Sequence, residues 1–219
     1  MCIRDRTSID LIVDYIFQKE RGVYIDVGCN HPVYNNNTFL LNKKGWQGIN
    51  IDIDKKSIEL FDLFRRKDLN INLAVSSFKG ELEYINFHEK SPINMIKDSK
   101  NESSHSAEKV EKIKSDTLNS IIEKSPYKDK KIDFVSIDVE GHEIEVIKGF
   151  NLKKYRPSII VIEYLDMSLE KIEIKNFNLE NIINSEIYKL MIENEYHMVN
   201  WLHSDLIFAH NSFRDTKYD

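Results

Sequence analysis

A run of apolar residues near the start of the chain is interrupted by an aspartate and breaks at a glycine, over the segment Val23, Tyr24, Ile25, Asp26, Val27, Gly28. The apolar residues suit a strand that is buried on both faces of a sheet. Gly28 lets the backbone turn tightly where a ligand must approach it. This feature predicts a nucleotide pocket at the carboxyl end of the first strand.

The placement of the acid narrows the kind of nucleotide. A dinucleotide-binding loop carries several glycines at fixed spacing and holds a pyrophosphate at a helix N-terminus. Here one glycine follows, and Asp26 would repel a diphosphate and attract a cation. A second strand-like run, residues 48–52, also ends in an acid, Asp52, about where a ribose-binding carboxylate belongs in a βαβ unit. The two acids together indicate a nucleoside that carries an amino acid.

Composition limits the class of protein. With 219 residues, of which 41% are hydrophobic, the chain can bury a substantial core, and we expect residues 7–219 to form one domain. A net charge of −5 without a dense Lys/Arg block argues against nucleic-acid binding. The apolar stretches are far shorter than the roughly 20 residues that span a bilayer, so we expect no integral membrane segment. Two cysteines, Cys2 and Cys29, cannot form a disulfide framework, which predicts a reducing cytoplasm.

Residues 1–6 are expected to be foreign to the protein, because they look like translated adapter sequence. Cys2 would then not be native. In that case an upstream helix that covers the ligand could be missing.

The pattern of apolar residues predicts alternating helices and strands. We expect a helix over residues 9–17 and another after Asp54, a good N-cap residue. The other expected elements are strands at 70–75, 132–138 and 159–163, an extra strand beside the parallel set at 82–87, and helices at 117–124, 142–148 (stopped by Gly149) and 180–195. The polar segment 91–111 predicts a surface loop that could serve as a lid. Residues 196–202 and 206–209, separated by a very short turn, predict an antiparallel hairpin.

This order of elements predicts an α/β fold of the Rossmann-like class I methyltransferase type. Its sheet would be mostly parallel, doubly wound, and closed by a C-terminal antiparallel β-hairpin.

Four segments of the sequence resemble the FkbM-type S-adenosylmethionine-dependent methyltransferases. They are residues 24–32 (YIDVGCNHP), 37–41 (NTFLL), 45–52 (GWQGINID) and 132–143 (IDFVSIDVEGHE). The resemblance runs from about Tyr24 to Glu163, and the ordered set is far more specific than its first motif alone. Cys29 stands where the family usually has alanine, a small-for-small change. The C-terminal third and residues 91–111 match poorly, so we expect the choice of acceptor to depend on them.

The resemblance implies a set of cofactor-binding residues at the ends of the first strands, namely Asp26, Gly28, Cys29, Asn30, Asp52, Ile53 and Ala74. Asp26 would face the methionine ammonium, and Gly28 would admit the methionine portion. Asp52 would accept both ribose hydroxyls, since an ionised carboxylate can take two donors. There are structural alternatives: Asp26 could cap a helix in a tight turn, and Asp54 could take the place of Asp52 at the ribose.

Asp138, Glu140 and His142 lie at the end of the fourth strand and in the turn after it, and the resemblance implies that this segment belongs to the reaction centre. Methyl transfer needs an acceptor oxygen in line with the methyl group and a base nearby. The sequence does not decide which of the three is the base. Asp138 could instead hold the methionine ammonium, Glu140 could cap the helix, and His142 could be an exposed first-turn residue. The residues expected at the acceptor are His31, Asn37 and Glu163. The carboxylates could also hold Mg²⁺, an alternative that the sequence does not favour, so no metal ligand is assigned.

The sequence thus predicts a bacterial, cytoplasmic O-methyltransferase that uses S-adenosylmethionine to methylate a hydroxyl of a small-molecule or glycan acceptor. The first choice of acceptor is a sugar of a surface polysaccharide or its lipid-linked precursor, and the alternative is a polyketide or other natural-product alcohol. A non-catalytic nucleotide-binding module in glycan assembly is the rival class. An NAD-dependent dehydrogenase is disfavoured because the further phosphate-loop glycines are missing. The oligomeric state stays open.

Overall fold

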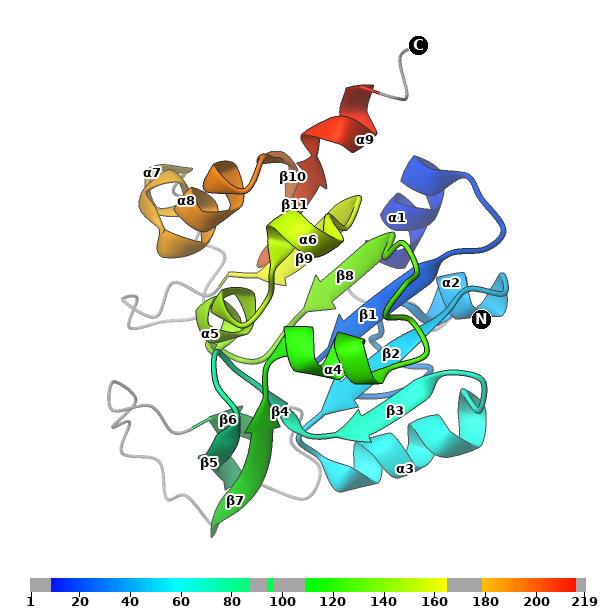
Figure 1. Ribbon diagram of the computed structural model, residues 1–219, viewed down its shortest axis with the longest axis vertical. Coiled ribbons are helices and arrows are strands. Elements are labelled where there is room, and N and C mark those ends of the chain that lie inside the picture. The colour runs from blue at the N-terminus through cyan, green and yellow to red at the C-terminus, as the bar shows by residue number, and fades with distance from the viewer. Residues whose placement is uncertain (1–8, 87–93, 97–108, 165–178, 216–219) are drawn as a thin grey trace.

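A seven-stranded, mostly parallel sheet forms the centre of the computed structural model, which describes residues 9–86, 94–96, 109–164 and 179–215 (Figure 1). Across the sheet the strands are β10 (Tyr196–Leu202), β11 (Asp205–His210), β9 (Ile159–Glu163), β8 (Phe134–Ile137), β1 (Val23–Val27), β2 (Gln47–Asp52) and β3 (Leu69–Asn72). The strands from β9 to β3 run parallel, and β11 is antiparallel to both β9 and β10. The predicted doubly wound sheet with its C-terminal hairpin is confirmed.

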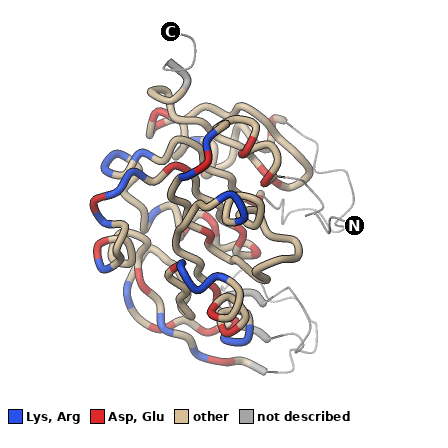
Figure 2. The backbone as a smooth tube through the Cα atoms, turned by 90° about the vertical axis from the view of Figure 1, so that its right-hand side faces the viewer, with Lys and Arg blue, Asp and Glu red and all other residues tan. Residues whose placement is uncertain are grey.

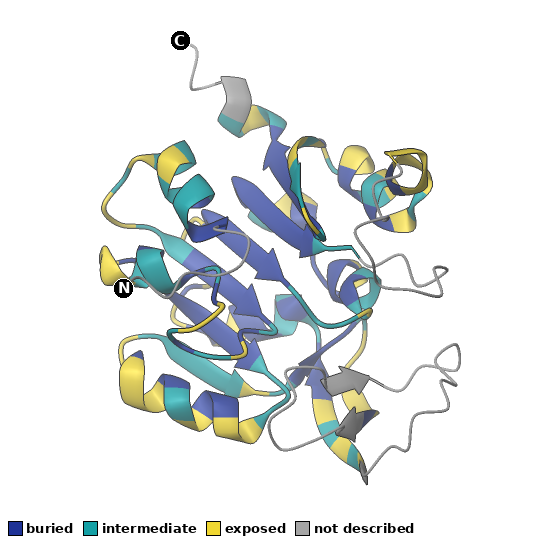
Figure 3. Ribbon diagram, turned by 180° about the vertical axis from the view of Figure 1, so that it is seen from behind, coloured by how far each residue is buried: buried dark blue, intermediate teal, exposed yellow. Residues whose placement is uncertain are grey.

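Helices cover both faces of this sheet. They are α1 (Ile9–Phe17), α2 (Phe39–Lys43), α3 (Lys55–Phe64), α4 (Leu118–Lys124), α5 (Glu143–Lys148), α6 (Leu152–Tyr155), α7 (Leu179–Asn184) and α8 (Glu186–Glu193), and α9 (Asn211–Asp215) follows the last strand. Alternate residues of a strand face opposite sides. Ile25 and Val27 therefore pack with apolar residues of α4 to α8, whereas Tyr24 packs with those of α1 and α2. The inner strands are mostly buried between these layers, whereas the edge strands β3 and β10 are more exposed (Figure 3).

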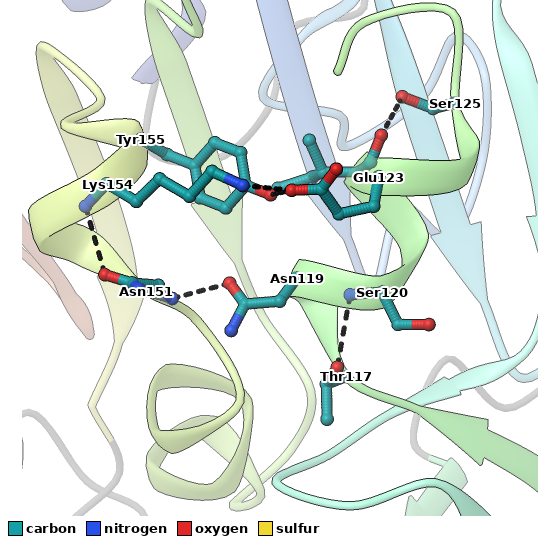
Figure 4. A network of polar contacts seen from close by, with 9 residues as sticks. Thr117, Asn119, Ser120, Glu123, Ser125, Asn151, Lys154 and Tyr155 are labelled. Carbon is teal, nitrogen blue, oxygen red and sulfur yellow. Dashed lines mark hydrogen bonds and ion pairs between the residues drawn. The ribbon is translucent and has the colours of Figure 1, made fainter. Parts of the chain in front are cut away.

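Polar contacts join α4 to α6 (Figure 4). Glu123 of α4 accepts a hydrogen bond from Tyr155 Oη at 2.9 Å and forms an ion pair with Lys154 of α6. The backbone N–H of Asn151 donates to Asn119 Oδ1 at 2.7 Å. The two short helices therefore hold each other in place on the face that α5 also covers.

A second, four-stranded sheet follows β3 in the chain. Its order is β4 (Ala74–Val75), β7 (Lys109–Asp116), β5 (Gly80–Asn86) and β6 (Asn94–Ile96). β4 pairs in parallel with the end of β7, and β5 and β7 form an antiparallel ladder. In Figure 1 this small sheet lies below the main sheet, on the side to which the parallel strands point. It therefore borders the edge where ligands bind in open α/β sheets.

The small sheet corrects two predictions. The strand predicted over residues 70–75 is two strands, because the chain leaves the main sheet after Asn72 and pairs Ala74 with Ser115. The extra strand predicted at 82–87 pairs with β7 in the small sheet instead of lying beside the parallel set.

Two further predictions also need correction. Residues 91–111 are not all loop, since β6 and the start of β7 fall among them, and residues 97–108 lie outside the described part of the chain. The long helix predicted over 180–195 is two helices, α7 and α8. The break occurs because Ser185 caps α8, accepting a hydrogen bond of 3.1 Å from Tyr188 N.

Charges of both signs are interspersed along the described backbone (Figure 2). Some form surface ion pairs, such as Lys148 with Glu186 at 3.0 Å. Exposed pairs of this kind contribute little to stability. Within the described ranges, no helix has the length and apolar character needed to cross a membrane.

Candidate active site

A row of polar side chains crosses one face of the main sheet near the carboxyl ends of its strands. In the register of the sheet, Ser136 of β8 lies beside Asp26 of β1. Asp26 lies beside Asn50 of β2, which lies beside Asn70 of β3. Three of the four, Ser136, Asp26 and Asn50, are buried. Buried polar groups need partners, and segments near this row supply them for all but Asn50 Oδ1, which has none among the described residues.

Asp26 finds its partners in the loop that follows β1. Its side chain is 3% exposed, and its Oδ2 accepts hydrogen bonds from Asn36 Nδ2 at 3.0 Å and Thr38 Oγ1 at 2.8 Å. Burial raises the pKa of Asp26 to about 6, although the charge of Arg65 and the two hydrogen bonds act in the opposite direction. Both donors are side chains, so these contacts are not a helix cap.

Gly28 brings the ends of β1 and β8 together. Its backbone has φ +79°, and its N–H donates to Ile51 O at 2.9 Å. A Cβ atom at this position would lie 1.6 Å from the backbone oxygen of Asp138, so another residue would displace β8. The sequence predicted that a ligand approaches the backbone closely at Gly28. In the structure the group that lies close to Gly28 is the backbone of Asp138, just after β8.

Asp52, at the end of β2, holds the same loop from the other side. Its Oδ2 accepts from Asn30 N and its Oδ1 from Asp54 N, both at 2.7 Å. Burial raises the pKa of Asp52 to about 6 against the effect of these bonds. Asp54, the rival for the ribose, caps α3 by accepting from Lys56 N at 2.9 Å. A carboxylate has about four lone-pair sites, so Asp52 retains acceptor capacity for a ligand.

Three carboxyl groups gather where β8 and β9 end. Asp138, Glu140 and Glu163 each offer one oxygen, and these oxygens lie within 4.8 Å of one another. Burial, with the nearby negative charges, raises the pKa of Glu163 to about 10 and that of Glu140 to about 7. A Glu163 carboxyl with this pKa is protonated at neutral pH, so it can donate a hydrogen bond to the neighbouring Asp138. The group could hold Mg²⁺, which prefers such ligands, but the proton on Glu163 also relieves the repulsion.

The turn after β8 has a left-handed backbone, with φ 54° at Glu140 and 100° at Gly141. Glu143 stabilises this turn from the buried side, since its Oε1 accepts from Val139 N at 3.1 Å and Gly141 N at 3.0 Å. His142 Nε2 lies 3.1 Å from Ser76 Oγ. The turn that carries the candidate catalytic residues is therefore fixed to the chain just after β4.

His31 and Asn37 hold the β1–α2 loop in shape. His31 Nδ1 accepts the backbone N–H groups of Val33 and Tyr34, each at 3.1 Å. Burial and the charge of Arg65 lower the pKa of His31. Asn37 Nδ2 donates to the buried Ser136 Oγ at 3.0 Å. Contact of either residue with an acceptor stays a prediction.

The remaining predicted cofactor residues follow the same strand ends. Cys29 is buried and Asn30 is exposed with φ 51°. Ile53 O accepts a hydrogen bond from Asn72 Nδ2 at 2.8 Å, and Ala74 is buried in β4. These residues therefore border the edge at which Asp26 and Asp52 lie.

Two residues of this site could not be identified from the sequence. Arg65, at the end of α3, is 3% exposed although its neighbour Arg66 is exposed. Two consecutive arginines at a helix end are typical of an exposed surface, so nothing in the sequence distinguished Arg65. Asn36 was also missed, although the motif beginning at residue 37 pointed to the correct loop.

Comparison with solved structures finds similar methyltransferases, all at low identity. A TehB-like SAM-dependent methyltransferase from Corynebacterium glutamicum is 9% identical with a TM-score of 0.47, over 95% of this chain and 90% of that chain. Monomeric WbdD is 11% identical with a TM-score of 0.47, over 95% of this chain and 42% of that chain. Precorrin-6y C5,15-methyltransferase from Geobacter metallireducens is 9% identical with a TM-score of 0.44, over 94% of this chain and 89% of that chain.

Comparison with protein families is more specific. No curated protein matches the chain closely enough to count as a relative. A family model described as the methyltransferase FkbM domain matches residues 26–202, which include all the site residues discussed above. The chain therefore belongs to the FkbM methyltransferase family and is an S-adenosylmethionine-dependent methyltransferase.

Proposed function

We propose that this methyltransferase acts on a hydroxyl of a glycan or small-molecule acceptor, above all a sugar of a surface polysaccharide or its lipid-linked precursor. The observation that carries the proposal is the group of ionisable side chains at the ends of β8 and β9, where Asp138 and Glu140 lie beside Glu163. Carboxyl groups with raised pKa values at the carboxyl edge of an open α/β sheet are typical of a reaction centre. A hydroxyl acceptor needs such a base, because it must lose its proton.

For the cofactor we assign Asp26 to the methionine ammonium and Asp52 to the ribose hydroxyls. S-adenosylmethionine supplies a methyl group activated by its sulfonium. Both acids have a pKa of about 6, so both are mostly ionised at neutral pH and can accept hydrogen bonds from a cation or from hydroxyls. The backbone and small side chains that complete this pocket are those of Gly28, Cys29, Asn30, Ile53 and Ala74.

Glu140 is our first choice for the base. Its pKa of about 7 suits proton transfer near neutral pH, whereas Asp138 lies beside the protonated Glu163 and His142 contacts Ser76. In the proposed reaction the acceptor oxygen bonds to the methyl carbon as the carbon–sulfur bond breaks. The hydroxyl proton passes to the Glu140 carboxylate.

The acceptor would contact Glu163, His31 and Asn37 at the same edge. Because the site is acidic, we expect the reacting part of the acceptor to be uncharged, which suits a sugar hydroxyl better than a phosphorylated one. An alcohol of a polyketide or other natural product meets the same condition and is the second candidate. A cytoplasmic location belongs to this proposal.

The experiment measures cofactor binding and turnover separately. Calorimetry with S-adenosylhomocysteine tests the pocket, and transfer of a labelled methyl group to hydroxylated glycans and alcohols tests the reaction. We expect Glu140→Gln, Asp138→Asn or His142→Ala to lose turnover by about 10²-fold to 10⁴-fold and still bind the cofactor. A chelator series with Mg²⁺ added back separates a metal-dependent site from a proton-transfer site.

Each outcome has a defined meaning. Parental turnover in all three variants would place the chemistry on another loop, with His31 and Glu163 as the next candidates. Tight cofactor binding without transfer to any hydroxylated acceptor would favour a non-catalytic module. A thermal shift with NAD but none with S-adenosylhomocysteine would overturn the assignment of the pocket.

A further inference from the structure

Arg65 is a buried arginine whose hydrogen bonds all go to neutral groups of the β1–α2 region. Its Nε and Nη2 donate to Pro32 O at 3.1 and 2.7 Å, and Nη2 also donates to Asn36 Oδ1 at 2.5 Å. Its Nη1 donates to Thr38 Oγ1 at 2.6 Å and to Tyr24 Oη at 3.3 Å. A charge that is taken out of water must be compensated. The buried position of Arg65 therefore indicates that a negatively charged group contacts these neutral partners.

Asn36 and Thr38 connect Arg65 to such a group, Asp26. Asn36 Oδ1 accepts from Arg65 and from Thr38 N, while its Nδ2 donates to Asp26 Oδ2 and to Cys29 O. Only one orientation of the amide satisfies all four contacts. Thr38 Oγ1 accepts from Arg65, so its own hydrogen is left for an acceptor. Two acceptors lie within reach of this hydrogen. Asp26 Oδ2, at 2.8 Å, is charged, whereas Asn36 Oδ1, at 2.9 Å, already accepts two hydrogen bonds.

We infer that Arg65 is a positioning residue for cofactor binding, which fixes the Asp26 carboxylate and the β1–α2 loop through Asn36 and Thr38. Arg65 does not touch Asp26 itself. The inference rests on the proposed role of Asp26 at the methionine ammonium. It adds a residue from the end of α3, outside the segments that the family resemblance brought forward.

The charge of Arg65 also keeps Asp26 ionised. Burial raises the pKa of Asp26, Arg65 lowers it, and the charge of Asp138 raises it. On the far side of the guanidinium, Tyr24 Oη donates to Asp68 at 2.5 Å, so a second carboxylate also faces this network. Asp52 titrates in the same pH range as Asp26. Its pKa depends on burial, on the backbone N–H groups of Asn30 and Asp54, and on nearby carboxylates, and Arg65 is not among these causes. Loss of the Arg65 charge should therefore raise the pKa of Asp26 and also those of Asp68 and His31, of which only Asp26 is assigned to the methionine ammonium.

The test is calorimetry of S-adenosylhomocysteine binding between about pH 5 and pH 8. The variants are Arg65→Met, which removes the charge, and Thr38→Val, which keeps the charge and removes one donor to Asp26. The matched control is Arg66→Met, since Arg66 is the exposed neighbour. Circular dichroism establishes that each variant is folded.

We expect the affinity of the parent to fall as the pH drops through about 6, because Asp26 must be ionised to hold the ammonium. In Arg65→Met that fall should move to higher pH by about one pH unit, so binding should be roughly fivefold weaker near pH 6 and close to tenfold weaker near pH 5. Thr38→Val should also move the fall in affinity to higher pH, but by less than Arg65→Met does. Arg66→Met should leave the pH dependence of the parent unchanged.

A purely structural role for Arg65 predicts a different result, namely weakening by the same factor at every pH. That result, or binding equal to the parent, would overturn the inference. If Arg65→Met does not fold, Thr38→Val decides: an unmoved pH dependence overturns the inference, and a shift to higher pH supports it. A parent chain that does not bind S-adenosylhomocysteine at all would instead overturn the proposed function, and the inference with it.

Discussion

Replacing Glu163 by glutamine should stabilise the protein, and the gain should grow with pH. Burial and the charges of Asp138 and Glu140 raise the pKa of Glu163 from 4.5 to about 10 in the folded chain. Folding therefore takes up a proton at neutral pH, and the free energy of unfolding falls as the pH rises above the unfolded value. Glutamine does not titrate, and its amide can still donate a hydrogen bond to Asp138.

The size of the effect follows from the same linkage. One proton taken up on folding changes the free energy of unfolding by about 1.4 kcal/mol for each pH unit. Between the unfolded pKa of 4.5 and about pH 8, the upper limit for Glu163 is therefore near 5 kcal/mol. Water reaches part of this site and screens its charges, so we expect about 1 to 2 kcal/mol. For a chain of this length that corresponds to about 2 to 8 °C in Tm.

The measurement is thermal unfolding of the parent and of Glu163→Gln between about pH 5 and pH 9, with chelator present. Glu81→Gln, an exposed change on β5, is the control and should follow the parent. Two parallel stability curves, or a variant that is less stable than the parent at high pH, would refute the reasoning. A second series with Mg²⁺ tests whether a cation neutralises the group: Mg²⁺ would then stabilise the parent and leave the variant unchanged.

Three further predictions concern the strand ends. Gly28→Ala should abolish S-adenosylhomocysteine binding, because the new Cβ would clash with Asp138 O. It should also destabilise the protein by more than the roughly 1 to 2 kcal/mol that a left-handed backbone costs a residue with a side chain. The control Gly45→Ala, where φ is +100° and the nearest atom to a Cβ is 3.7 Å away, should show only that backbone cost. Asp52→Ala should lose on the order of 1.5 to 3 kcal/mol of cofactor binding in calorimetry, and unchanged binding would assign the ribose to another residue. The parental rate should rise with pH through about 7 as Glu140 loses its proton, and Glu140→Gln should remove this rise; a rise that persists in the variant would identify another base.

The strand-end acids could be predicted from the sequence because the signal is local. A buried run that ends in Asp26 or Asp52 places the acid at a known edge of a parallel sheet, whatever the rest of the chain does. The same holds for Asp138, which follows the fourth strand directly.

The partners of these acids could not be predicted, because they come from distant segments. Arg65 meets Asp26 only through Asn36 and Thr38, and no pattern in α3 marks it as buried. β7 reads KVEKIKSD, and its first residues belonged to the predicted polar loop; it becomes a strand because β5 and β4 pair with it. For the same reason the break between β3 and β4 was missed, since the partner of Ala74 lies far along the chain in Ser115.

The pairing of β4 with the end of β7 has a consequence for how this protein can diversify. β5 and β6 of the small sheet lie in the segment between Val75, which ends β4, and Asp116, which ends β7. These two residues are paired neighbours. Ser76 N donates to Asp116 O at 3.1 Å, which fixes the two ends of the segment between them. The part of that segment after Ser77 can therefore be lengthened, shortened or exchanged for the corresponding part of another family member without moving the strands that carry the acids or the contact of Ser76 with His142. We expect chimaeras joined after Ser77 and at Asp116 to keep the fold and the cofactor pocket while they differ in the acceptor they accept.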